Sequence, residues 1–296
     1  MINNHRTAIA ALFLSVVVMA FQDVYLATRL DSIHPAELIV LMFTCVNIVA
    51  FAGLILHRPK WPKLTAGNLW IHVLFNLSTA ASWIGTFIAL KNLQPTVVSA
   101  LTLSVPPTFS ALQSIKNKQG LANRLIGTIL VVAGIALALF GGAELNFEFT
   151  KTTLMGLASS LVAALGVWGN AEFSRSLSRR GYTTNQTFCL RFILLTAASA
   201  LYLFSGPYYT ELSKTDVGVF SAVAVFTFYF PMLLLYRSSS LLSVHSVTIG
   251  LALTPLVTLL MQSFSRFQTT PQECLGMILL AAGVIVGVMN QPGETA

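Results

Sequence analysis

The chain has 296 residues, of which 55% are hydrophobic and only 9% are charged, and its mean hydropathy is +0.76. A soluble domain usually carries about 25% charged residues, so this composition excludes an ordinary soluble enzyme. Ten helices of about 20 residues each would use roughly 200 residues and leave length only for loops and tails. The composition therefore predicts a polytopic helical membrane protein without a soluble catalytic domain.

Polar breaks divide the apolar runs into ten predicted spans. Such breaks follow the second run at 57–63, the fourth at 116–120 and the sixth at Arg179-Arg180-Gly181. The first run continues for about 20 residues after the charged start of the chain and has no convincing cleavage site, so we interpret it as an uncleaved span. The predicted spans are residues 7–28, 35–56, 69–90, 94–115, 124–141, 153–175, 187–204, 217–236, 243–265 and 274–290.

The charge balance is basic, with 17 Lys and Arg against 10 Asp and Glu, a net charge of +7. No basic stretch is interleaved with aromatic residues as in a nucleic-acid surface, so nucleic acid is not an expected partner. The three cysteines form no CxxC pair and lie in or beside apolar runs, which predicts small core residues rather than disulfides or a metal site. They are Cys45, Cys189 and Cys274.

Alternate loops differ in their basic charge. One side receives eleven Lys and Arg and the other receives five, whereas Arg191 lies within a span. Because Lys and Arg are retained on the cytoplasmic side, the richer side is predicted to be cytoplasmic, with both termini on it. The eleven residues are Arg6, Arg58, Lys60, Lys63, Lys116, Lys118, Arg124, Arg175, Arg179, Arg180 and Arg237.

The two halves of the chain match each other at an offset of 149 residues. The same offset places Asp23 of the first span on Glu172 of the sixth. Shared Leu, Ile, Val and Ala are expected by chance, but shared Pro, Gly, Gln-Ser and acidic positions are not. We therefore predict one five-helix repeat at residues 1–149 and a second at 150–296. The coinciding positions include Val98 with Val247, Pro106 with Pro255, Gln113 with Gln262, Ser114 with Ser263, Gly127 with Gly276, Ile129 with Ile278, Leu130 with Leu279, Ala133 with Ala282 and Gly134 with Gly283.

Five spans per half is an odd number, so the second repeat must cross the membrane in the opposite orientation to the first. Inverted repeats are the architecture of secondary transporters, whose two similar halves exchange conformations and open a midplane site first to one side and then to the other. The sequence thus predicts an all-α membrane protein with ten transmembrane helices in two inverted repeats. This organisation favours a carrier over a channel or an enzyme.

Nearly the whole chain resembles the drug/metabolite transporter superfamily, specifically its ten-span EamA-type members. The resemblance lies in the length, the five-plus-five organisation and the Gly-x-x-x-x-x-Ala-Gly helix that ends each half, here 127–134 and 276–283. Arg191-Phe192 is similar to the family's Arg-Phe pair, although the first half has Met42-Phe43 in its corresponding region. The resemblance implies a multi-pass carrier in the cell inner membrane that exports amino acids or related compounds.

The segment Gln22-Asp23-Val24 resembles an Asn-Asp-Val found in members similar to S-adenosylmethionine carriers. Uptake or exchange of a substrate of that kind is therefore the alternative function. A membrane-embedded enzyme, such as a lipid transferase, is a more remote alternative. It would need acids, histidines or cysteines clustered near one face, and the few ionisable groups of this sequence are scattered. A non-transporting scaffold or sensor is a further one.

Asp23 and Glu172 are the candidate coupling residues, with Gln22 beside the first. Asp23 lies about 25 Å along a helix from Arg6, toward the outer end of its span, and the inverted Glu172 lies toward the inner end of its own. One interpretation is that the two acids flank the pathway and attract a substrate amine or exchange protons. The alternative is a pair of interfacial acids, with Glu172 bound to Arg175.

Two basic side chains and three prolines are further candidates. His245 can titrate near neutral pH or serve as a hydrogen-bond partner between helices. Arg191 can hold a substrate carboxylate or extend to the cytoplasmic headgroups. Prolines free a backbone carbonyl and allow bending, so they are candidate hinges, and static kinks are the alternative. The prolines are Pro106, Pro107 and Pro255.

Hydroxyl, amide and aromatic groups in the spans can line a cavity for an amphipathic metabolite, although small polar residues also mediate helix packing in lipid. The glycines of the fifth and tenth spans are expected to serve close packing within a half or across a dimer. The candidate lining residues are Asn76, Ser78, Thr79, Ser82, Trp83, Trp168, Asn170, Phe228 and Tyr229, with Thr102, Ser104 and Thr254 beside the prolines.

The sequence has no P-loop, HExxH or GxSxG motif, so neither ATP hydrolysis nor another enzymatic activity is expected. No cluster has metal-ligand spacing, and no cofactor or metal is assigned. The expected partners are a small-molecule substrate, protons in some coupling schemes, and the lipid bilayer. The sequence is compatible with either a monomer or a homodimer.

Overall fold

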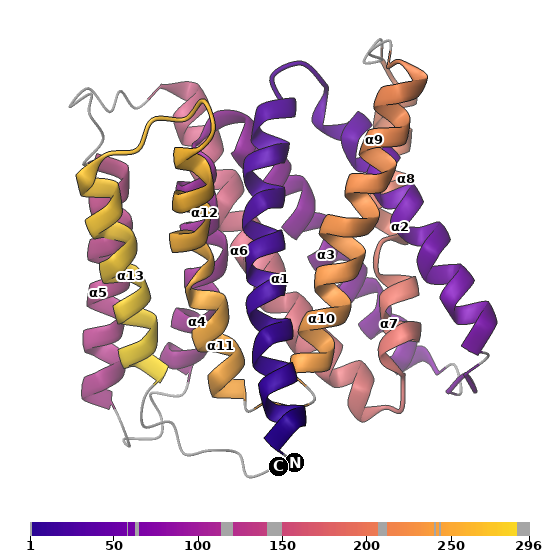
Figure 1. Cartoon of the computed structure of the whole chain (residues 1–296). Coiled ribbons are helices and arrows are strands. Elements are labelled where there is room, and N and C mark those ends of the chain that lie inside the picture. Colours follow the sequence, from indigo (N-terminus) through magenta and orange to yellow (C-terminus); the bar gives the residue numbers. More distant parts are fainter. Residues whose placement is uncertain are drawn as a thin grey trace.

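The computed structural model describes residues 2–57, 59–62, 65–113, 121–140, 150–206, 212–239, 241–242 and 244–288, and all regular secondary structure in these residues is helical. The elements are α1 (Ile2–Arg29), α2 (Pro35–His57), α3 (Ala66–Asn92), α4 (Pro95–Gln113), α5 (Leu121–Phe140), α6 (Lys151–Arg179), α7 (Thr184–Arg191), α8 (Ile193–Phe204), α9 (Lys214–Ala224), the π-helix η2 (Val225–Tyr229), α10 (Phe230–Ser239), α11 (Val244–Ala252), α12 (Thr254–Ser263) and α13 (Pro271–Val288). They pack into one bundle, in which α1 begins and α13 ends toward the same side (Figure 1).

The helices have the length and surface of membrane-spanning segments. Large apolar side chains are exposed on the outside of the bundle, as expected where lipid replaces water. They include Phe13 (58% exposed), Leu56 (81%), Phe204 (79%) and Phe226 (67%). The predicted all-α, multi-pass membrane protein is thus confirmed, whereas the ten-span count and the inverted repeats stay predictions. Within the described residues, the helices long and apolar enough to cross a membrane are seven: Arg6–Arg29, Pro35–His57, Ala66–Asn92, Lys151–Arg179, Thr184–Phe204, Lys214–Leu235 and Ser246–Ser263. Shorter apolar helices cover Pro95–Ser104, Leu125–Phe140 and Pro271–Gly287.

Local side-chain signals explain several helix ends. Thr183 before α7 and Ser213 before α9 form capping boxes with Gln186 and Asp216, which satisfy backbone N–H groups that have no partner within the helix. After α6 the chain turns at Gly181, whose φ of +86° lies in the left-handed region that glycine adopts without strain. The starts of α7 and α9 and the end of α6 therefore coincide with capping and turn residues in the sequence.

Three of the predicted spans are not regular α-helices throughout. Phe192 separates α7 from α8, η2 lies between α9 and α10, and Leu253 separates α11 from α12. Two of the interruptions have a proline just beyond them, Pro231 and Pro255. Proline lacks an N–H and its ring clashes with the carbonyl four residues earlier, which a wider π turn or a break relieves. Pro255 therefore lies at a break, where a hinge residue would be found.

Glycines allow α5 and α13 to pack antiparallel with their backbones in contact. A Cβ atom on Gly127 would lie 2.5 Å from the Gly283 carbonyl oxygen, and one on Gly134 would lie 2.5 Å from the Gly276 carbonyl oxygen. This contact joins the first half of the chain to the second. The expectation of packing within a half or across a dimer was therefore wrong, because the two glycine faces fit each other within one chain.

Contacts between the halves recur when the chain is shifted by 149 residues. The ring centroids of Phe43 and Phe192, which are 149 positions apart, lie 4.9 Å from each other. Asn47 Nδ2 donates to Thr196 Oγ1 at 3.1 Å across the same separation. Likewise, α3 packs on α6 and α10 packs on α1, while α4 packs on α6 and α12 packs on α1. If each helix is replaced by its equivalent in the other half, the α3–α6 contact becomes the α10–α1 contact. The α4–α6 contact likewise becomes the α12–α1 contact.

Candidate functional site

Six aromatic side chains gather where α2, α3, α7 and η2 meet, and we call them the central aromatic cluster. Ring centroids lie 5.0 Å apart for Phe43 and Phe228, 4.8 Å for Trp83 and Phe228, and 5.2 Å for Phe188 and Tyr229. Both halves of the chain contribute rings, so the cluster lies at their interface. Its members are Phe43, Trp83, Phe188, Phe192, Phe228 and Tyr229.

Polar atoms without a hydrogen-bond partner occur on the helices that pack around this cluster. Among the described residues, Tyr25 Oη, Asn47 Oδ1, Trp83 Nε1 and Thr227 Oγ1 are buried and have none. An unpaired polar group in apolar surroundings costs about 1–3 kcal/mol. A polar solute that reached the cluster could therefore find both donors and acceptors there. Sequence reasoning singled out Trp83 but missed the other three, because each looks like an ordinary span residue.

A buried polar chain links α7, α3 and α6. Arg191 Nε donates to Thr79 Oγ1 at 3.3 Å, and Thr79 Oγ1 donates to Asn170 Oδ1 at 2.8 Å. The three residues are 7%, 0% and 6% exposed, and the guanidinium lies over the rings of Phe75 and Phe192 at 5.7 and 5.3 Å from their centroids. Arg191 therefore points into the bundle and does not extend to the headgroups, since the polar chain and the two rings hold its head group there.

Asn76 stabilises the break between α7 and α8. Its Nδ2 donates to the Leu190 carbonyl oxygen at 2.8 Å, and its Oδ1 accepts from the Leu194 N–H at 3.2 Å. These two backbone groups flank Phe192, whose φ of −103° and ψ of 5° interrupt the helix. The interruption would otherwise leave both groups without helical partners, so Asn76 acts on the backbone of the second half.

The two candidate acids, Asp23 and Glu172, occupy equivalent positions of the two halves at the offset of 149 residues, but their surroundings differ. Asp23 is half-buried on α1 and makes no hydrogen bond or ion pair with another described residue. Gln22 beside it is 4% exposed. Glu172 is exposed and its Oε1 lies 3.2 Å from Arg175 Nη1, which is the pairing expected if it is an interfacial acid. A coupling role for either acid stays a prediction.

Ser78 and Ser82 lie in the packing seam between α3 and α6. A Cβ atom on Gly169 would lie 2.5 Å from Ser78 Oγ, and one on Gly166 would collide with the backbone of Ser82. A Cβ on Gly85 would in turn lie 2.6 Å from the Ser159 carbonyl oxygen. Small residues on both helices thus allow this close approach, which favours the packing interpretation of the two serines.

The remaining candidates lie apart from the cluster or outside the described residues. Trp168 is half-buried on α6, and its Nε1 has no hydrogen-bond partner among the described residues. Thr102 bonds back to the Val98 carbonyl oxygen at 2.8 Å, and Ser104 and Thr254 are buried. The side chains of Pro106, Pro107 and His245 lie outside the described residues. Within the described part of the chain, no three His, Cys, Asp or Glu side chains are grouped to hold a metal ion.

A small open crevice adjoins the central aromatic cluster. Asn185, the second residue of α7, lines it at the predicted cytoplasmic end, and Phe188 and Tyr229 line it at the cluster. The Cys189 thiol donates to the Ala50 carbonyl oxygen at 2.9 Å along its wall. The crevice therefore connects the cluster toward the predicted cytoplasmic side. Its lining residues are Ala50, Gly53, Asn185, Phe188, Cys189, Tyr229 and Leu233.

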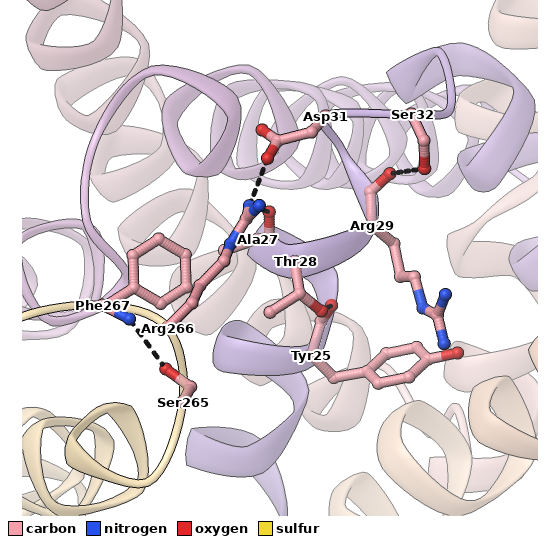
Figure 2. Close-up of polar contacts among 9 residues, drawn as sticks. All are labelled: Tyr25, Ala27, Thr28, Arg29, Asp31, Ser32, Ser265, Arg266 and Phe267. Carbon is pink, nitrogen blue, oxygen red and sulfur yellow. Dashed lines mark hydrogen bonds and ion pairs between the residues drawn. The ribbon is translucent and has the colours of Figure 1, made fainter.

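Polar ties join helices at both ends of the bundle. At the predicted cytoplasmic end, Arg180 Nη1 donates to Asn68 Oδ1 at 2.7 Å and ties α6 to α3. At the opposite end, Arg266 forms an ion pair with Asp31 and donates to the Ala27 carbonyl oxygen at 3.4 Å, so it ties the turn after α12 to the end of α1 (Figure 2).

Comparison with known proteins bears on the fold alone. The chain matches no protein-family model and no curated protein. Among the solved structures that match it, one described only as "Crystal structure of protein" is 18% identical, and the alignment covers 95% of this chain and 96% of that chain with a TM-score of 0.60. At this identity the likeness establishes a shared architecture over nearly the whole of both chains.

Proposed function

We propose that this protein is a secondary carrier with ten transmembrane helices in two inverted five-helix repeats. It moves a small polar or amphipathic metabolite across the cell inner membrane by alternating access, with both termini in the cytoplasm. The observation that carries the proposal is the contact between residues 149 positions apart, Phe43 with Phe192 and Asn47 with Thr196. Residues related by a repeat touch each other where they lie beside the axis that relates the two halves.

The glycine contacts of α5 and α13 support the same axis. The shift of 149 converts Gly127 into Gly276 and Gly134 into Gly283, so the contact between Gly127 and Gly283 becomes the contact between Gly276 and Gly134. Both contacts occur, and they occur between antiparallel helices. Two halves related in this way can exchange conformations, which is the physical basis of alternating access in inverted-repeat carriers.

The composition of the interface supports a small amphipathic substrate. The central aromatic cluster offers apolar ring faces, and buried unpaired groups such as Trp83 Nε1 and Thr227 Oγ1 offer hydrogen bonds beside them. Interrupted helices at Phe192 and at η2 border this region, and broken helices are common at carrier binding sites. We propose export of an amino acid or a related compound as the physiological direction.

Solute flux in proteoliposomes tests the proposal. The purified chain is reconstituted and its counterflow of labelled amino acids, amines and nucleoside-like compounds is measured with and without a pH gradient. We expect saturable, protein-dependent counterflow of at least one of these classes. Trp83→Ala removes a ring of the central aromatic cluster and should reduce that flux at least tenfold.

Trp70→Ala is the matched control, because Trp70 lies on the same helix and is 62% exposed. It should leave the flux unchanged. If no solute class moves faster than in liposomes without protein, the carrier proposal fails and a scaffold or sensor becomes the better interpretation. If solute moves but both tryptophan variants behave alike, the central aromatic cluster is not the substrate site.

A further inference from the structure

Gln262 ties the outer end of α12 to the first half of the chain, and it is one of the positions that the two halves share at the offset of 149 residues. Its side chain is fully buried. Its Oε1 accepts from the Thr96 N–H at 3.1 Å and from Thr96 Oγ1 at 2.6 Å, and its Nε2 donates to Gln94 Oε1 at 2.9 Å. Thr96 is the second residue of α4, so its N–H has no partner within that helix. A side chain of the second half therefore caps the start of α4.

Arg266, in the turn after α12, makes a second tie at the same end. Its guanidinium forms an ion pair with Asp31 and donates to the Ala27 carbonyl oxygen at 3.4 Å (Figure 2). The side chains of the pair are 49% and 55% exposed, so water weakens their attraction, and the buried Gln262 contributes more. Because α1 and α4 belong to the first half and α12 to the second, both ties join the halves at the end opposite the predicted cytoplasmic side.

The other end of α12 lies at a break. Leu253 separates α11 from α12, and Pro255 is the second residue of α12. The helix then runs for 10 residues, from Thr254 to Ser263, which is about 15 Å. A break beside a proline bends more readily than a continuous helix. α12 can therefore bend at its inner end, whereas its outer end is bound to the first half.

The crevice beside the central aromatic cluster lies toward the opposite side of the membrane. It is lined by α2 of the first half and by α7, η2 and α10 of the second. Arg180 bonds to Asn68 at this side, but it joins α6 to α3, which glycines already hold close together, and neither helix lines the crevice. The halves are thus bonded at the outer end of α12 and leave an open crevice toward the cytoplasmic side.

We propose that Gln262 and Arg266 form an outer latch, which holds the carrier in an inward-facing state and releases when α12 bends at the break beside Pro255. This rests on the proposed carrier function and adds how its outer side is closed. Each buried neutral hydrogen bond shifts an equilibrium about fivefold, because water replaces it when the site opens. The three bonds of Gln262 can therefore favour one state by about a hundredfold and still be released.

Two reporters test the latch in the full chain, reconstituted in lipid nanodiscs with the three native cysteines replaced by alanine. Spin labels on Ser32→Cys and Gln268→Cys, both exposed at the outer end, give the distance across that end. In a separate chain, the rate at which N-ethylmaleimide modifies Asn185→Cys reports access to the crevice. With the latch intact, we expect one short distance to dominate and Asn185→Cys to be modified.

Gln262→Leu keeps much of the side-chain volume and removes all three hydrogen bonds. The ratio of longer to shorter outer distances should therefore rise at least tenfold, and modification of Asn185→Cys should slow. Ser263→Ala is the matched control, because Ser263 is exposed beside Gln262 and its Oγ donates to the Leu260 carbonyl oxygen of its own helix at 2.7 Å. The control should leave both readouts unchanged.

Arg266→Gln should shift both readouts in the same directions, with a rise of about two- to fivefold in the distance ratio, as expected for an exposed ion pair. Combining Asp31→Arg with Arg266→Asp restores opposite charges and should reverse most of the shift. If Gln262→Leu does not fold, these two variants decide.

Opposite responses of the two reporters are what alternating access requires, whereas a loosened turn would lengthen the outer distance and leave Asn185→Cys unchanged. That second result would refute the latch, as would an unchanged distance in Gln262→Leu or an equal change in Ser263→Ala. Solute flux separates the two proposals. Opposite responses without flux of any solute would leave the latch and refute the carrier, and flux with either refuting result would do the reverse.

Discussion

Side chains that look interchangeable in the sequence have distinct tasks in the structure. Asn76 and Asn170 are both amides within spans, yet Asn76 bonds to the backbone of α7 and α8 while Asn170 bonds to the Thr79 hydroxyl. The first supports a helix break and the second leaves a buried nitrogen available. Substitution of Asn76 should therefore affect the stability of the helix break, whereas substitution of Asn170 should not.

Asn76→Ala should lower the free energy of unfolding by about 2–3 kcal/mol, because the Leu190 carbonyl and the Leu194 N–H would lose their partner in apolar surroundings. Denaturant titration in micelles measures the change. Asn92→Ala on the same helix is the control, since Asn92 bonds to the Ile88 carbonyl of its own helix at 2.7 Å. A loss as large in the control would show that the break does not depend on Asn76.

His34, between α1 and α2, gives the protein a pH dependence of known sign. Its Nδ1 accepts a hydrogen bond from the Ala36 N–H at 3.2 Å. Burial, together with the charge of Lys91 and against that of Glu37, holds the pKa of His34 below its usual 6.5. The unfolded chain then binds the proton more readily than the folded one.

Stability contributed by neutral His34 is therefore present above pH 6.5 and is lost as the pH falls through 6.5 toward the lower pKa of the folded state. His34→Gln should make the free energy of unfolding less dependent on pH between about 7 and 5.5. Denaturant titrations of both proteins across this range measure the two slopes. Equal slopes would contradict the prediction.

At the scale of helices, the interruptions and the close-packed pairs have separate causes. η2 and the break at Leu253 accompany Pro231 and Pro255, whereas the break at Phe192 depends on Asn76 from another helix. The α5–α13 and α3–α6 pairs depend on glycines whose missing Cβ atoms let the backbones meet. Breaks permit bending and close pairs resist it, so movement is expected at the former.

Gly134→Ala should destabilise the protein by about 1–3 kcal/mol, because the new Cβ would lie 2.5 Å from the Gly276 carbonyl oxygen and push α5 from α13. Gly218→Ala is the matched control, since a Cβ on this glycine of α9 would meet nothing within 4 Å. Alanine is the better helix former, so the control should be up to about 1 kcal/mol more stable. Unfolding titrations compare the two, and destabilisation by Gly218→Ala alone would overturn the assignment.

At the scale of the whole molecule, the proposed inversion has a direct topological consequence. Ser32 lies just after α1, and Ser178 is the second-last residue of α6. Both are exposed at the end of the first helix of their half. In inverted repeats these equivalent ends face opposite sides of the membrane, whereas in parallel repeats they face the same side.

Single cysteines at these positions, in a chain with Cys45, Cys189 and Cys274 replaced by alanine, test the consequence. A membrane-impermeant maleimide should label Ser32→Cys in intact cells and Ser178→Cys only after lysis. Labelling of both from one side would contradict the inverted arrangement and, with it, the carrier proposal.

Part of the candidate site followed from the sequence. Trp83, Phe228 and Tyr229 were expected as lining residues and do share one cluster. Glu172 has the partner expected for an interfacial acid, Arg175. Tyr25, Asn47 and Thr227 could not be selected, because an unpaired buried atom is defined by its neighbours and leaves no pattern along the chain.

Sequence alone determined that the chain is helical and crosses a membrane repeatedly, because apolar content and segment length act locally and decide whether a helix is stable in lipid. The sequence also contains the match between its two halves at an offset of 149 residues. Only the tertiary structure decided that Phe43 meets Phe192, that Gly134 packs on Gly276 across the halves, and that Arg191, Thr79 and Asn170 form one chain. Such contacts join helices distant in the sequence, and they depend on how the surfaces of the whole bundle fit together.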